Sequence, residues 1–454
     1  MKRGMFLVVN MSKGNVGKLL LSFSLPMLIS NCFQQMYNMA DSIVAGKYAG
    51  LTALAAVGAS YPITMIFIAV ASGFSIGATV IISRFFGAEE FSKMKTAIFT
   101  AVTSALGIAL VFTAVGVGFS DKMLEILKTD AAIMADSAVY LDIYCWGLVF
   151  LFLYNIVTGI FTAMGDSKTP LVFLIVSSVS NIIFDVIFVR NLSMGVAGVA
   201  WATFLCQAVC SLGASFVLYI RLRHMTLGVK FRIFSFGMLK TISHIAIPSI
   251  LQQSFVSVGN LFIQGIINSF GYAATGGYSA AIKLNTLAIS SFSTMSSSIS
   301  SFTSQNVGAK KYSRIKEGFR YGAIIVCCTA TVFTLVFLIF NRSLISIFLE
   351  NTADESAEAL KIGMRFLLIC SPFYPFICLK LTADGVLRGT GNMSGFMFAT
   401  FLDLILRVVL AYILSKPFGT DGIWFSWPIG WVSATVASLI LYKTGKWRKM
   451  TDSE

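Results

Sequence analysis

Residues 25–44 read LPMLISNCFQQMYNMADSIV, and residues 247–266 read IPSILQQSFVSVGNLFIQGI. Each stretch opens on an apolar residue followed by proline, Leu25-Pro26 and Ile247-Pro248, and continues as a long and mostly apolar run. About 20 such residues are what an α-helix needs to cross a bilayer. The two stretches therefore predict two membrane-spanning helices at equivalent places in a duplicated chain.

The composition of the whole chain agrees with a membrane protein. Of its 454 residues, 56% are hydrophobic and 12% are charged, and the mean hydropathy is +0.82. Soluble globular proteins carry roughly 25% charged residues. A soluble enzyme, a nucleic-acid-binding module and a disordered protein are therefore poor interpretations of this sequence.

Twelve apolar stretches are long enough to cross the membrane as helices, the structure that leaves no backbone group unpaired in lipid. They are residues 18–44, 52–82, 96–118, 136–162, 170–189 and 195–219 in the first half, and 241–269, 276–304, 321–341, 360–386, 393–414 and 422–442 in the second. The segments between them are short. We therefore predict an all-α polytopic membrane protein without a separate soluble domain.

The net charge of +14 is explained by the topology of the loops. Cytoplasmic loops of membrane proteins are enriched in Lys and Arg. With the N-terminus inside, most Lys and Arg residues fall in the N-terminal segment, the inner loops, the stretch 221–240 and the C-terminal tail. The outer loops hold only Lys47, Lys122, Lys128, Arg190, Arg342 and Lys416. We expect both termini to be cytoplasmic, in a cell (inner or plasma) membrane, and we expect no nucleic-acid partner.

The two halves of the chain repeat three landmarks in the same order. These are the proline pairs above, the Gly-Ala pairs at 87–88 and 308–309, and the turns at 165–166 and 391–392. Repeats of six spans each are related by an axis along the membrane normal, with a substrate path at their interface. The sequence thus predicts two six-helix bundles with pseudo-twofold symmetry: an N-terminal lobe (1–220), a basic cytoplasmic linker (221–240) and a C-terminal lobe (241–454) with a short basic tail.

Neither enzymatic chemistry nor a resident cofactor is expected. The eight cysteines lie in apolar stretches without a CxxC pair, and the two histidines, His224 and His244, lie in or beside a cytoplasmic loop. A zinc site or a disulfide framework is therefore improbable. An intramembrane enzyme would need a nucleophile or metal ligands that we do not find, so we expect no catalytic residue.

Several ionisable residues fall inside predicted spans, where they mark candidate functional sites. Lys380/Asp384 and Asp403/Arg407 are i,i+4 pairs, which can neutralise each other on one helix face. Lys283 has no such partner, so its ammonium can approach a substrate or a distant acid.

Asp41 and Asp185 have polar neighbours instead of basic ones. Gln34 and Tyr37 share a helix face with Asp41, and Asn181 lies one turn before Asp185. Burial favours the protonated form of a carboxyl group, and hard cations prefer oxygen ligands. The cluster can therefore bind a proton or a cation. Pro26, before the polar face, predicts a bend or hinge in the first span.

The two repeats, Pro26 and Asp41, the turns GDSKTP (165–170) and LRGTGN (387–392), and the Asn181–Asp185 pair resemble the multidrug and toxic compound extrusion (MATE) family, most closely its DinF-type branch. The resemblance implies a secondary active transporter that exports organic cations and amphipathic drugs in exchange for H⁺ or Na⁺ by alternating access. It implies a cation-coupling cluster of Asp41, Asn155, Asn181, Asp185 and Thr203.

The same resemblance implies that Gln34, Tyr37 and Tyr140 border the substrate cavity, to which we add Lys283. A coupling Na⁺ would be held at Asp41, Asn181 and Asp185. The acids that the NorM-type branch places in the C-terminal lobe are replaced here by Val256 and Ile377. We expect a monomer that binds drug-like molecules within the bilayer.

The alternative function is a flippase for lipids or lipid-linked saccharides, from the same superfamily. Such proteins favour a basic central cavity and often carry additional helices. The acids of the N-terminal lobe and the count of twelve spans favour the drug exporter.

Overall fold

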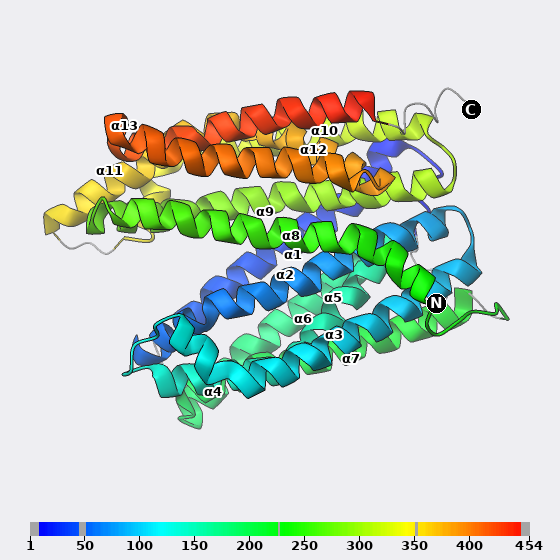
Figure 1. Cartoon of the computed structure of the whole chain (residues 1–454), viewed down its shortest axis with the longest axis horizontal. Coiled ribbons are helices and arrows are strands. Elements are labelled where there is room, and N and C mark those ends of the chain that lie inside the picture. Colours follow the sequence, from blue (N-terminus) through cyan, green and yellow to red (C-terminus); the bar gives the residue numbers. More distant parts are fainter. Residues whose placement is uncertain (1–8, 45–50, 226–227, 350–352, 446–454) are drawn as a thin grey trace. The chain divides into compact units, whose positions relative to one another are not determined.

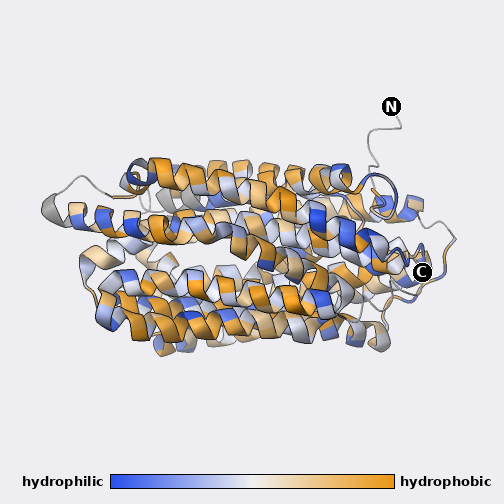
Figure 2. Ribbon diagram, turned by 90° about the horizontal axis from the view of Figure 1, so that it is seen from above, coloured by the Kyte–Doolittle hydropathy of each residue, from blue (hydrophilic) through white to orange (hydrophobic). Residues whose placement is uncertain are grey.

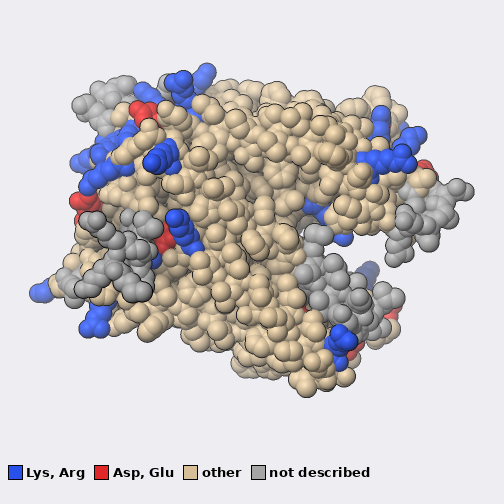
Figure 3. Space-filling model, turned by 180° about the vertical axis from the view of Figure 1, so that it is seen from behind, with Lys and Arg blue, Asp and Glu red and all other residues tan. Residues whose placement is uncertain are grey.

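The computed structural model describes residues 9–44, 51–225, 228–349 and 353–445. Within these ranges the chain is almost entirely helical and contains no β-strand. Hydrophobic residues cover most of the length of the helices, as Figure 2 shows. On the face drawn in Figure 3, charged side chains gather near the helix ends and leave a broad uncharged band between them. This distribution is typical of a multi-pass membrane protein.

The first six spans are built from seven α-helices and a short π-helix (Figure 1). They are α1 (Val16–Val44), α2 (Leu51–Gly87), α3 (Phe91–Ile126), α4 (Met134–Trp146), α5 (Leu148–Ala163), α6 (Lys168–Asp185), the π-helix η2 (Val186–Asn191) and α7 (Gly195–Met225). The helices α4 and α5 meet at an angle of 47° and together form the fourth span.

The second six spans follow the same order. They are α8 (Phe236–Asn268), α9 (Tyr272–Gly308), α10 (Ser313–Ser346), α11 (Ala353–Cys370), the short 3-10 helix η3 (Ser371–Phe373), α12 (Tyr374–Thr390) and α13 (Met393–Thr444). The helices α11 and α12 join through η3 into one span.

The last helix, α13, contains two spans, because its 52 residues reverse direction at Gly419. Gly419 has φ 59° and ψ −138°, a conformation that glycine adopts most readily. A Cβ atom on Gly422 would clash with the backbone carbonyl of Leu414, so the two arms turn tightly. Figure 1 shows the arms running back alongside each other.

All twelve predicted stretches are helical in the structure. In the described residues, nine helices are long and apolar enough to cross a membrane, and the bent α4–α5 pair makes ten. The reversal of α13 adds a further span. The helix α9 adds the last, since its 37 residues are long enough to cross the membrane and it is rich in serine.

The described chain forms two compact units that resemble the two repeats but exchange the first parts of α1 and α8. One unit holds residues 25–250 and the residues up to Asn10, and the other holds residues 11–24 and 251–454. The division therefore falls inside α1 and α8, close to Pro26 and Pro248. The connection between α7 and α8 covers only 226–235, because both helices extend into the predicted linker 221–240.

Each unit is also bound by the segment that precedes one of these two helices. In the second unit, the Met11 amide donates to Gln305 Oε1 at 2.8 Å, and Lys311 Nζ donates to the Ser12 carbonyl at 2.8 Å. In the first unit, Ser92 Oγ donates to the Lys230 carbonyl at 2.7 Å. In both repeats, the segment before the first helix is therefore held by hydrogen bonds.

Candidate functional site

Two polar side chains of the N-terminal unit are enclosed within an apolar stretch of α6. Asn181 and Asp185 are 1% and 0% exposed, respectively, and their i,i+4 spacing puts them on one helix face. Immediately after Asp185 the chain continues as the π-helix η2. Such π-helical turns occur frequently at functional sites.

The Asn181 amide links α6 to α7. In the orientation that satisfies both of its neighbours, Asn181 Nδ2 donates to Asp185 Oδ2 at 2.8 Å, and its oxygen accepts from the Thr203 backbone amide at 3.2 Å. In the opposite orientation, Nδ2 faces Thr203 Oγ1 at 3.4 Å. The structure thus brings together three of the five predicted coupling residues.

Asn155 is held differently. Its Nδ2 donates to the carbonyl of Leu151 on its own helix at 2.8 Å. The Asn155 backbone carbonyl accepts from Ser75 Oγ at 2.7 Å, which joins α5 to α2. These contacts position the helix and do not connect the Asn155 side chain to Asp185.

The remaining predicted residues of the N-terminal unit lie on α1 and α4. Asp41 falls within α1, but its side chain lies outside the described residues. Gln34 Nε2 donates to Asn38 Oδ1 at 3.2 Å on the same helix, and Tyr37 is half-buried. Tyr140 packs against Val189 of η2 and places an aromatic ring beside the segment that follows Asp185.

The second unit contains Lys283 and the two predicted ion pairs. Lys283 is exposed, and its Nζ lies 5.2 Å from the centroid of the Phe348 ring. The pair Lys380–Asp384 and the pair Asp403–Arg407 each close at 2.8 Å, and their side chains are buried. The predicted internal neutralisation of both pairs is confirmed.

The comparison with known families decides the identity of the chain. The MatE family model matches residues 26–187 and 248–413, and each match begins at one of the two repeat prolines. The chain belongs to the MatE family. MatE proteins are membrane transporters rather than enzymes, in agreement with the expected class.

Other proteins resemble this MatE chain over almost its full length. The probable multidrug resistance protein YpnP of Bacillus subtilis is 27% identical over 441 residues, which cover 97% of each chain. The multidrug export protein MepA of Staphylococcus aureus is 23% identical over 95% of this chain and 94% of its own. A crystal structure of MATE in complex with MaL6 has a TM-score of 0.92, with 22% identity over 98% of this chain and 100% of that one.

Arg221 corrects one prediction about this MatE chain. It was counted with the basic cytoplasmic linker, but it lies in α7, is 4% exposed and forms an ion pair with Asp166. Asp166 also accepts hydrogen bonds from the backbone amides of Lys168 and Thr169 at 3.0 Å, and so caps the start of α6. Because α7 extends beyond its apolar stretch, hydropathy alone placed Arg221 in a loop.

The position of Arg388 corrects a second prediction. It was counted with a cytoplasmic loop, but it lies in α12, is 7% exposed and donates to Ser296 Oγ at 3.0 Å. Asp384 also accepts from Ser438 Oγ at 2.8 Å. The spacing of Lys380, Asp384 and Arg388 by four residues is the sequence signal that would have placed all three on one buried face.

The described residues of the MatE chain contain no group of three or more His, Cys, Asp and Glu side chains that could hold a metal ion. The Asn181–Asp185 pair offers one carboxylate and one amide oxygen from α6. A hard cation would draw on such oxygens, and a proton needs only the carboxylate.

Proposed function

We propose that this MatE chain is a secondary active multidrug efflux transporter. It exports organic cations and amphipathic drugs in exchange for H⁺ or Na⁺ by alternating access. Two similar full-length proteins are named for multidrug resistance and multidrug export, which supports the substrate class. The coupling ion is proposed from the site itself.

The observation that carries the proposal is the burial of Asp185 beside Asn181. A carboxylate within a membrane span costs about 2.5–3.5 kcal/mol on insertion scales, which makes it a functional candidate by default. Binding a proton or Na⁺ at Asp185 neutralises this charge. The free energy of ion binding is therefore available to shift the protein between two conformations.

The Asn181 amide supplies a way for the site to respond. When Asp185 is ionised, the amide donates Nδ2 to it, as in the 2.8 Å contact. When Asp185 carries a proton or Na⁺, the amide turns and presents its oxygen, while Nδ2 faces Thr203 Oγ1. Occupation of the site thus changes the hydrogen bonding between α6 and α7. We assign Asp41, from α1, as the second carboxylate of this site.

The drug is proposed to bind against Gln34, Tyr37 and Tyr140 of the first unit, and Lys283 of the second unit is proposed as a further drug-binding residue. Linkage requires that an ion that weakens drug binding is itself bound more weakly when drug is present. Pro26 is the proposed hinge, because a proline inside a helix removes a backbone hydrogen bond and bends it. The chain acts as a monomer in the cell membrane, with both termini in the cytoplasm.

The test is drug transport by purified protein in liposomes with an imposed pH gradient or Na⁺ gradient. Wild-type protein should move a fluorescent organic cation against its gradient with one ion and not the other. Asp185→Asn and Asp41→Asn should abolish this coupling. Asp142→Asn, which alters another span carboxylate, should retain it. Full coupled transport by both Asp185→Asn and Asp41→Asn would refute the proposal.

The flippase alternative is favoured by one observation in the second unit. Among the residues that the structure describes there, the buried cations Lys380, Arg388 and Arg407 outnumber the buried carboxylates Asp384 and Asp403. A surplus of buried positive charge suits an anionic lipid headgroup. Ion-independent translocation of a fluorescent anionic lipid, without drug transport, would favour this alternative.

A further inference from the structure

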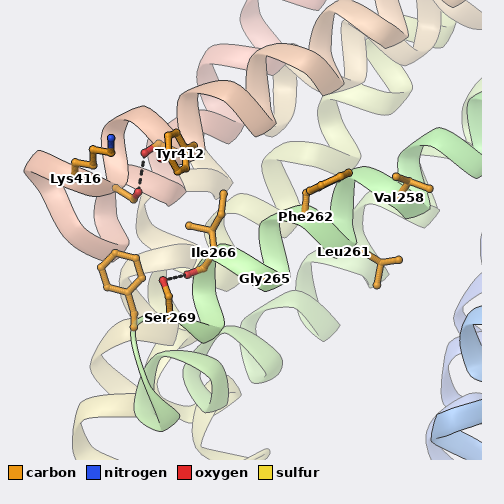
Figure 4. Close-up of a pocket in the computed structure, with 10 residues that line it drawn as sticks. Val258, Leu261, Phe262, Gly265, Ile266, Ser269, Tyr412 and Lys416 are labelled. Atoms are coloured by element: carbon orange, nitrogen blue, oxygen red, sulfur yellow. Dashed lines mark hydrogen bonds between the residues drawn. The ribbon is translucent and has the colours of Figure 1, made fainter. Parts of the chain in front are cut away.

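An apolar groove lies between α8 and the first arm of α13 in the second unit (Figure 4). Its volume is about 730 Å³, and it runs along α8 from Val258 to the turn at Phe270 that follows the helix. Leu261 and Phe262 are 61% and 63% exposed on this helix. The groove belongs to neither the Asn181–Asp185 site nor the buried ion pairs.

One end of the groove is basic. Lys416 is the charged member of the ten lining residues, and its Nζ lies 4.7 Å from the centroid of the Tyr412 ring. The hydroxyls of Ser269 and Ser415 at the same end donate to backbone carbonyls at 2.7 and 2.9 Å. The Lys416 ammonium is therefore the group of the lining that can attract an anion.

The basic end lies where α8 and the first arm of α13 end. Phe270 precedes the turn at Gly271, and Lys416 precedes the reversal at Gly419. At 1.5 Å per residue, α8 rises about 15 Å between Val258 and its last residue, Asn268. Half of the hydrocarbon core is about 15 Å thick. The groove is thus about as long as one leaflet, with its charge at the depth of the lipid headgroups.

A glycine keeps the middle of the groove open. Gly265 lines it (Figure 4), and a Cβ atom built on Gly265 meets no other heavy atom within 4 Å. A Cβ atom at this position would therefore project into the groove without displacing protein atoms.

We propose that this groove holds an acyl chain of an anionic phospholipid whose phosphate pairs with Lys416. The apolar walls and the one-leaflet length fit the acyl chain. The ammonium selects an anionic headgroup and disfavours a cationic drug. A surface ion pair between one lysine and one anion is worth up to about fivefold in affinity.

The test uses native mass spectrometry of the full-length protein in detergent with dioleoyl phosphatidylglycerol or dioleoyl phosphatidylcholine. Wild-type protein should retain the phosphatidylglycerol about fivefold better than the phosphatidylcholine. Lys416→Gln should remove this preference, and Gly265→Leu should lower the retention of both lipids. Inorganic phosphate alone should not compete with phosphatidylglycerol at equal concentration.

Matched controls come from α3, where Lys122 Nζ lies 5.7 Å from the Phe119 ring centroid and a Cβ atom on Gly118 meets nothing within 4 Å. Lys122→Gln and Gly118→Leu should leave retention unchanged.

The proposal is overturned if wild-type protein retains both lipids equally. It is also overturned if Lys416→Gln keeps the preference, if Gly265→Leu retains both lipids, or if the α3 variants match the groove variants. Displacement by inorganic phosphate would show headgroup binding without the groove and overturn it as well.

Discussion

Asn181 Nδ2 lies 2.8 Å from Asp185 Oδ2, and both side chains are buried on α6. The amide is itself fixed by the Thr203 backbone on α7. The carboxylate is therefore held by a partner that can act as donor or acceptor. This property fits a group that is alternately ionised and occupied during a transport cycle.

Removal of the Asn181 amide should make proton binding easier. Asn181→Ala takes away a donor to the ionised carboxylate, and hydrogen bonds to charged groups contribute about 1.5–3 kcal/mol. Because one pH unit corresponds to about 1.4 kcal/mol, the pH at which protons displace a fluorescent drug should rise by about one to two units. Equilibrium drug binding measured against pH checks this shift.

Thr203→Val is the control for that measurement. It removes the hydroxyl but keeps the backbone amide that the Asn181 oxygen accepts from. In Thr203→Val, the pH at which protons displace half of the bound drug should rise less than it does in Asn181→Ala. If this pH falls or stays unchanged in Asn181→Ala, the result contradicts the role given to the amide.

Removing one charge of the buried pair Asp403–Arg407 should lower the stability of the protein more than removing both charges. Arg407→Met leaves a buried carboxylate without its counter-ion, which typically costs about 3–5 kcal/mol. The double variant Asp403→Asn/Arg407→Met removes both charges and should recover most of that stability. Thermal unfolding in detergent distinguishes the two. An equal loss in the single and double variants would show that the charges are not coupled.

The reversal of α13 should tolerate no side chain at Gly422. A Cβ atom there meets the Leu414 carbonyl, whereas a Cβ atom on Gly107 in α3 meets nothing within 4 Å. Gly422→Ala should therefore lower the yield of folded protein severalfold. Gly107→Ala should be neutral or stabilise by up to about 1 kcal/mol. Monodisperse yield on size-exclusion chromatography provides the measurement, and equal yields would contradict the tight turn.

Sequence patterns predict the parts of this fold that the bilayer imposes. Lipid offers no hydrogen-bond partner to the backbone, so apolar length alone located all the spans. The i,i+4 rule likewise predicted Lys380–Asp384, because both residues belong to one helix. The spans around Gly419 were separated correctly even though a single long helix element covers both.

Features that depend on distant parts of the chain were not predictable in this way. Arg221 is buried because Asp166, 55 positions away, neutralises it. Arg388 is buried beside Ser296 of α9, 92 positions away. The exchange of the first parts of α1 and α8 between units also follows from long-range packing. Hydropathy reports none of these partners, so it assigned both arginines to loops.

The account rests on Asp185 as a coupling carboxylate. The direct test is uptake of a fluorescent organic cation into liposomes containing wild-type or Asp185→Asn protein, with pH and Na⁺ gradients imposed one at a time. We predict that one gradient accelerates wild-type transport at least tenfold and that Asp185→Asn loses this acceleration while still binding drug. Equal acceleration of both proteins would contradict the account.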